Sequence, residues 1–196
     1  TLMALRYARE QGAKVLAICN TQGSTIPRES DAVLYTHAGP EVAVASTKAF
    51  LTQIVATYLV ALYVAQVRGN KFGDEIQAVV RDLNDMPQKI DLVLDTTEEV
   101  KALAEELKDV KSVLFIGRHV GYPVALEGAL KLKELAYMHA EGFAAGELKH
   151  GPIALLEDGV PVICIVPPPS GRSILHEKIV SNIQEVRARG ARTIVI

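Results

Sequence analysis

Short apolar runs alternate with longer helical patterns along this chain. The runs lie at residues 14–19, 32–36, 112–117, 160–166 and 191–196. Each is mostly apolar and is bounded by polar or turn-forming residues, as expected of strands buried in a parallel sheet. Because helical patterns separate several of these runs, the sequence predicts an α/β protein with parallel sheets flanked by helices.

The alternation occurs in two halves that meet near residues 72–96. This segment is charged and helical, and Pro87 interrupts it because proline removes a backbone donor from a helix. The sequence therefore predicts one subdomain in residues 1–71, a helical crossover in residues 72–96 and a second subdomain in residues 97–196.

The segment from Ala49 to Val67 carries no charge and is long enough to span a membrane. Polar residues are spread through it, however, and it has no aromatic belt at its ends. A helix enclosed by other protein layers accounts better for this composition, so we expect no membrane association.

The chemically most informative stretch runs from Tyr122 to His139. Its alanines, leucines, lysines and glutamates favour a helix, and its apolar content predicts that the helix is mostly buried. Glu127, Lys131 and Glu134 fall on one stripe of that helix. Burial and mutual repulsion could leave one carboxylate titrating near neutrality, as a base that moves protons must. The alternative is an ordinary ion pair from Glu127 to Lys131, with Glu134 at a solvated edge.

Two further positions are candidates for ligand contacts. Ser46 and its two successors place hydroxyls and free N–H groups at a predicted helix start, which suits an anion or a sugar hydroxyl. Ordinary helix capping is the alternative, and it is the more frequent role of such residues. His150 lies in a glycine-flanked loop and is a candidate acid or base, with a surface or capping role as the alternative. Gly117 and Gly121 flank the loop after a strand, where ligands bind in open α/β sheets.

Composition narrows the class of protein. The formal charge of −2 offers no electrostatic footprint for nucleic acid. Cys19 and Cys164 lie in apolar runs, as expected of reduced core residues in a cytosolic protein. The chain begins at Thr1 inside a helical pattern and stops inside a strand pattern, so we expect a fragment of a longer polypeptide.

Three motifs resemble one enzyme family. The stretches VAVASTKAF at residues 42–50, ALEGALKLKELAYMHAE at 125–141 and GELKHGP at 146–152 are similar to the isomerase region of glutamine-fructose-6-phosphate aminotransferases. The resemblance extends over essentially the whole chain. It implies two sugar isomerase (SIS) subdomains, both incomplete here, in a cytoplasmic homodimer that needs no metal or organic cofactor.

The resemblance also implies roles for individual residues. Glu134 would be the base that moves a proton between C1 and C2 of the sugar, and Glu127 and Lys131 would tune it and hold sugar hydroxyls. His150 would assist opening of the sugar ring, in the site of the neighbouring subunit. Val44, through its backbone, and Ser46 would contact the sugar.

The family resemblance implies fructose 6-phosphate and glucosamine 6-phosphate as ligands, and ammonia from a glutaminase domain outside this chain. The family's phosphate loop would precede Thr1 and its Schiff-base lysine would follow Ile196, so the fragment alone is expected to be inactive. Two alternatives remain: a SIS module that senses a sugar phosphate without catalysis, and a phosphosugar isomerase that performs no amination.

Overall fold

The computed structural model describes residues 1–169 and 174–196. Within these residues the chain folds into two compact units, Thr1–Thr96 and Thr97–Ile196. Both are layered arrangements of parallel strands and helices, which confirms the predicted α/β class. The assignment of residues 1–71, 72–96 and 97–196 to two subdomains and a crossover stays a prediction. The sequence also predicts a loop at residues 167–171, after the apolar run at 160–166, and this loop lies partly outside the described residues.

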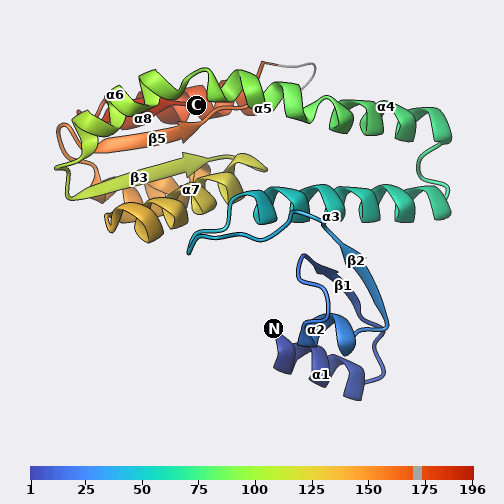
Figure 1. The fold of residues 1–196 in the computed structure, drawn as a ribbon. Coiled ribbons are helices and arrows are strands. Elements are labelled where there is room, and N and C mark those ends of the chain that lie inside the picture. The colour runs from blue at the N-terminus through green and yellow to red at the C-terminus, as the bar shows by residue number, and fades with distance from the viewer. Residues whose placement is uncertain (170–173) are drawn as a thin grey trace. The chain divides into compact units, whose positions relative to one another are not determined.

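The first unit contains a two-stranded parallel sheet, in which β1 (Leu16–Cys19) pairs with β2 (Ala32–Tyr35). Helix α1 (Leu2–Glu10) precedes the sheet, and the short helix α2 (Thr25–Arg28) lies between its strands in the sequence (Figure 1). Helix α2 was not predicted from the sequence, because its region is polar and rich in turn-forming residues. Both predicted strands are present and are one or two residues shorter than expected.

Three helices follow the sheet, after an irregular segment at residues 36–47. Helices α3 (Lys48–Val67) and α4 (Gly73–Asn84) form an antiparallel hairpin, and α5 (Met86–Leu94) follows after a single-residue break (Figure 1). Pro87 occupies the first turn of α5, where its missing N–H costs little. The interruption predicted at Pro87 is therefore confirmed.

Helix α3 is much more exposed than the sequence predicts. Only Ala56 and Leu62 are buried along its length, and Tyr63 is 68% exposed. The expected enclosure by other protein layers is therefore wrong for the described residues, because β1 and α4 cover only part of the helix surface. Among the described helices, only α3 is long and apolar enough to cross a membrane. Core helices of soluble proteins meet the same criterion of length and composition.

The second unit contains a four-stranded parallel sheet with the order β4-β3-β5-β6. The strands are β3 (Ser112–Gly117), β4 (His139–Ala144), β5 (Pro161–Ile165) and β6 (Arg192–Val195). Strand β3 lies between β4 and β5, with Phe115 opposite Gly142 on one side and Ile163 on the other. The carboxyl end of β3 thus lies inside the sheet and not at its edge.

Helices cover both faces of this sheet (Figure 1). Leu114 and Ile116 of β3 pack on α8 (Leu175–Arg187), whereas Val113 and Phe115 pack on α7 (Gly121–Ala136). This alternation follows from the two-residue period of a strand. Helix α6 (Thr97–Leu107) precedes β3, and two short 3₁₀ helices, η1 (Ala145–His150) and η2 (Pro152–Leu155), follow β4.

Strand β4 was also not predicted from the sequence. The sequence predicts a helix through His139 and a loop around His150, but α7 ends at Ala136 and Tyr137 adopts a left-handed conformation with φ of 54°. The strand is rich in alanine and glycine, which have low strand propensity. These small residues suit close packing, since a Cβ on Gly142 would lie 3.0 Å from the Cα of Leu126 in α7.

The two cysteines differ in environment, and both are free thiols. Cys164 on β5 is fully buried, as predicted, and burial raises the pKa of its thiol to about 12. Cys19 at the end of β1 is only partly buried. The expectation of a core thiol is therefore confirmed for Cys164 and wrong for Cys19, because the two-stranded sheet leaves the end of β1 partly uncovered.

Candidate functional site

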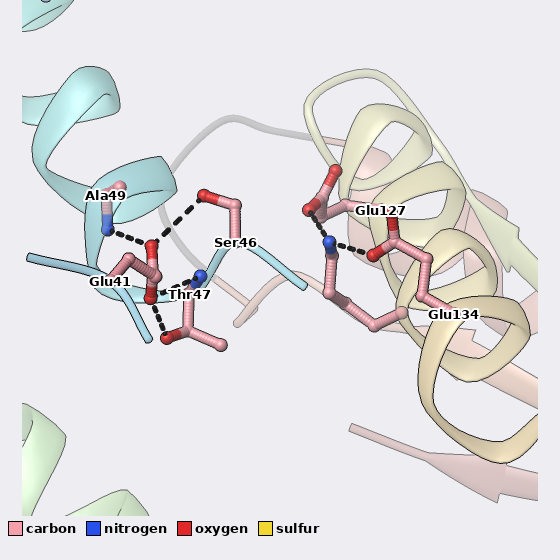
Figure 2. Close-up of polar contacts among 7 residues, drawn as sticks. Glu41, Ser46, Thr47, Ala49, Glu127 and Glu134 are labelled. Atoms are coloured by element: carbon pink, nitrogen blue, oxygen red, sulfur yellow. Dashed lines mark hydrogen bonds and ion pairs between the residues drawn. The ribbon is translucent and has the colours of Figure 1, made fainter. Parts of the chain in front are cut away.

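Three charged side chains of α7 form a continuous ion-paired group, as the helical spacing predicts (Figure 2). The Nζ atom of Lys131 lies 2.5 Å from Oε2 of Glu134 and 3.4 Å from Oε1 of Glu127. The side chains of all three residues are between 23% and 29% exposed. The group is thus neither fully solvated nor sealed from a ligand.

The charges within this group reinforce one another. The hydrogen bond from Lys131 to Glu134 is the main cause that raises the pKa of the Lys131 ammonium, and both carboxylates add to it by charge. Lys131 is therefore held as a cation between two acceptors. The ion pair from Glu127 to Lys131 is present, and Glu134 joins it instead of standing apart.

The helix that carries this group is less buried than expected. Gly121, Ala125 and Ala129 are its buried residues, whereas Leu135 is 60% exposed. The expectation of a mostly buried helix is therefore wrong, because α7 packs on the sheet with a single face. The charged group lies at the margin of that face, which leaves its oxygens reachable.

The start of α7 is fixed by its contact with the end of β3. A Cβ on Gly117 would lie 2.1 Å from the carbonyl oxygen of Gly121 and 2.7 Å from the backbone nitrogen of Tyr122. The sequence suggests that Gly117 lets a ligand come close to the backbone. The close approach at Gly117 is instead made by the first residues of α7. It sets the direction in which α7 leaves the sheet.

His150 is the last residue of η1 and is strongly exposed. Its Nε2 lies 3.9 Å from Oε2 of Glu147, and its side chain is 74% exposed. The preceding residues anchor it, since Leu148 is buried in the core and Lys149 pairs with Glu185 of α8 at 2.8 Å. His150 thus projects from a firmly held backbone.

A polar network near the end of β3 was not predicted from the sequence. Arg118 donates through Nη1 to Oδ1 of Asn182 at 2.8 Å, and Asn182 donates through Nδ2 to Glu185 at 3.4 Å. The hydrogen bond from Lys149 is the main cause that lowers the pKa of Glu185. Asn182 is the only polar residue in the described part of the chain that is buried. A charged residue directly after an apolar strand was the available signal for Arg118.

Val44 and Ser46 lie in the first unit, in the segment that leads into α3. Val44 is 91% exposed, and Ser46 is partly buried. The buried side chain of Ala45 lies between them in the sequence and anchors the segment. The backbone of this segment is therefore accessible while one side chain holds it in place.

A carboxylate that sequence reasoning overlooked caps α3 (Figure 2). Oε1 of Glu41 accepts hydrogen bonds from Oγ1 and the backbone N–H of Thr47, at 2.7 and 3.1 Å. Oε2 accepts from the backbone N–H of Ala49 at 3.1 Å and from Oγ of Ser46 at 3.4 Å. The helix start that the sequence offers to an anion or a sugar hydroxyl thus already holds the carboxylate of Glu41. The signal was an acid a few residues before a Ser-Thr helix start.

The hydrogen bonds to Glu41 make it an unusually strong acid. The hydroxyl of Thr47 is the main cause that lowers its pKa to about 2, and backbone N–H groups contribute. Because this value lies below the ordinary 4.5, the carboxylate stabilises the fold above pH 4.5, and this contribution is lost as the pH falls toward about 2.

In an NMR titration we expect the Thr47 and Ala49 amide signals to shift with a midpoint near pH 2. A midpoint near 4.5 would contradict the cap.

The sequence matches the SIS domain family over residues 1–63 and 106–196. This match covers most of the chain, and the described fold of parallel sheets flanked by helices agrees with it. The chain therefore belongs to the SIS domain family.

Its similarity to particular proteins is also high. Over its full length the chain is 76% identical to the glutamine-fructose-6-phosphate aminotransferase (isomerizing) of Streptomyces coelicolor and 74% identical to that of Corynebacterium diphtheriae. It spans about a third of each, 32% of their length. The C-terminal domain of glucosamine-fructose-6-phosphate aminotransferase from Francisella tularensis superposes with a TM-score of 0.94 at 39% identity, over all of this chain and 54% of that one.

Proposed function

We propose that this chain is the isomerase part of an enzyme that makes glucosamine 6-phosphate and glutamate from fructose 6-phosphate and glutamine. The observation that carries the proposal is the group formed by Glu127, Lys131 and Glu134, in which a partly exposed carboxylate is held by a cation on a rigid helix. The names of relatives at 76% and 74% identity support it.

The proposed chemistry needs one base. The C2 carbonyl of the open-chain sugar first forms a Schiff base with the family's lysine outside this chain, with loss of water, and ammonia then displaces the lysine to give the free imine. Glu134 then takes a proton from C1 while the imine nitrogen gains one, which gives a planar enolamine. The proton returns to C2 as the O1 hydroxyl loses its own, and the product is the 2-amino aldose. A single carboxylate suffices because the planar enolamine presents C1 and C2 to the same face.

The neighbouring charges have supporting roles in this proposal. Lys131 holds Glu134 in the ionised, hydrogen-bonded position, and Glu127 keeps Lys131 in place. Glu127 and Lys131 also offer polar atoms to the sugar hydroxyls. Val44, through its backbone, and Ser46 contact the sugar. The ammonia comes from a glutaminase domain outside this chain, and the enzyme works in the cytoplasm as a homodimer.

One assay separates this function from its alternatives. The full-length protein that carries this chain is given fructose 6-phosphate, with and without glutamine, and the products are quantified. We expect glucosamine 6-phosphate and glutamate in equal amounts, only when glutamine is present. Glucose 6-phosphate formed without glutamine would indicate a simple isomerase, and sugar binding without any product would indicate a sensor.

His150 is proposed to assist ring opening in the active site of the partner subunit. Its 74% exposure and firmly held backbone are compatible with projection away from its own unit. We expect His150→Ala and Glu134→Gln proteins to be nearly inactive alone. Mixed under conditions of subunit exchange, they should regain about a quarter of wild-type activity per dimer, because half of the dimers are hybrids with one intact site. Mixtures as inactive as the parents would argue against a shared site.

A further inference from the structure

The segment between Glu41 and α3 has little to hold its shape except Glu41. Val42 and Val44 are 95% and 91% exposed, so their side chains gain almost nothing from packing. Ala45 supplies one buried anchor. The remaining constraint is the Glu41 carboxylate, which joins the start of the segment to Thr47 and Ala49 at its end. The conformation of residues 42–46 therefore depends on this clamp.

The same carboxylate determines what Ser46 offers to a ligand. A serine hydroxyl has one hydrogen to donate and two lone pairs to accept with. The Ser46 hydroxyl donates to Oε2 of Glu41 in a long contact of 3.4 Å, and a carboxylate that stays ionised above about pH 2 can only accept. Ser46 is thus left with lone pairs, which pair with an O–H donor and not with a phosphate oxygen.

Two backbone N–H groups at the start of α3 already have an acceptor. Glu41 accepts from the N–H groups of Thr47 and Ala49, so the positive end of the helix already faces a negative charge. A second anion at this position would meet that charge at short range. The local chemistry therefore favours a neutral, hydroxyl-bearing ligand group and disfavours phosphate.

We propose that Glu41 is a positioning residue of the sugar site, which clamps residues 42–46 and orients Ser46 so that this segment binds a sugar hydroxyl and not the phosphate. The proposal rests on the proposed function, in which Val44 and Ser46 contact the sugar. If Glu41 were only a helix cap, its loss would lower stability and leave sugar affinity unchanged.

The direct test measures the dissociation constant of fructose 6-phosphate by calorimetry in the full-length protein and its Glu41→Gln variant. The amide keeps the shape but presents an N–H₂ group to N–H donors, so we expect about tenfold weaker sugar binding, the scale of one lost charge-assisted hydrogen bond. Glu75→Gln is the matched control, because Oε2 of Glu75 caps α4 through the Phe72 N–H at 2.9 Å, outside this segment. Glu75→Gln should lower the melting temperature about as much as Glu41→Gln does. It should change the dissociation constant of fructose 6-phosphate by less than twofold.

Two further readouts distinguish positioning from stability. In a Ser46→Ala background, Glu41→Gln should weaken sugar binding clearly less than in the wild type, because one of the groups that it orients is already gone. Competition by inorganic phosphate should be equal or stronger in the Glu41→Gln variant, because the charge that disfavours a second anion at this helix start is gone. Unchanged or tighter sugar binding in Glu41→Gln, or markedly weaker competition by phosphate, would overturn the proposal.

These affinities do not depend on turnover, so the two proposals fail separately. A wild-type protein that binds fructose 6-phosphate without forming glucosamine 6-phosphate contradicts the proposed function, while the affinity ratio still tests Glu41. An active wild type with an unaffected Glu41→Gln variant contradicts only the role of Glu41.

Discussion

Replacing Glu134 with glutamine is expected to lower glucosamine 6-phosphate formation about 10³-fold, the scale of a lost general base. An amide has the size of the carboxylate but cannot take a proton from C1. The fold should persist, because Lys131 keeps Glu127 as a partner at 3.4 Å and the Glu134 side chain is 29% exposed. The measurement is steady-state product formation by the full-length protein, with circular dichroism to confirm folding.

A matched carboxylate on α6 provides the control for Glu134. Glu98 pairs with Lys101 at 2.6 Å, three residues away, as Glu134 pairs with Lys131, but its side chain is 82% exposed. Exposed pairs of this kind contribute little to stability, so Glu98→Gln should leave activity within twofold. If Glu134→Gln kept more than about a tenth of wild-type activity, Glu134 would not be the base.

The largest effect on stability is expected from Gly117→Ala. The new Cβ would lie 2.1 Å from the Gly121 carbonyl oxygen, and the obstacle is backbone that cannot move without displacing α7 from the sheet. We expect a loss of at least about 3 kcal/mol in the free energy of unfolding, in the severe range for overpacking. Chemical denaturation followed by circular dichroism measures it.

The other partner of this contact supplies the control. A Cβ on Gly121 would meet Cγ2 of Ile165 at 3.4 Å, which is ordinary van der Waals contact. Gly121→Ala should therefore change the unfolding free energy by less than about 1 kcal/mol. Equal stability of the two variants would show that β3 and α7 do not approach as closely as described.

Sequence reasoning succeeded where a local pattern determines the structure. The apolar run of β3 and the helix formers of α7 are read from single segments, and the 3.6-residue period places Glu127, Lys131 and Glu134 together. These are the features on which the proposed chemistry depends. They required no knowledge of which other segments pack beside them.

It failed where tertiary contacts decide. Strand β4 forms because Gly142 and its neighbours fit between β3 and α7, although their composition argues against a strand. The exposure of α3 and α7 depends on what covers them, which periodicity cannot specify. Glu41 was missed for a different reason: its partners Thr47 and Ala49 lie six and eight residues further along the chain, a spacing that matches no regular capping pattern.

The central claim is that the base that moves the proton lies on α7. It is tested most directly by exchange of the C1 hydrogen of fructose 6-phosphate in heavy water with glutamine present, catalysed by the full-length protein and its Glu134→Gln variant. We predict exchange with the wild-type protein and none above background with the variant. Equal exchange by both proteins would contradict the claim, as would a wild type that binds fructose 6-phosphate but catalyses no exchange.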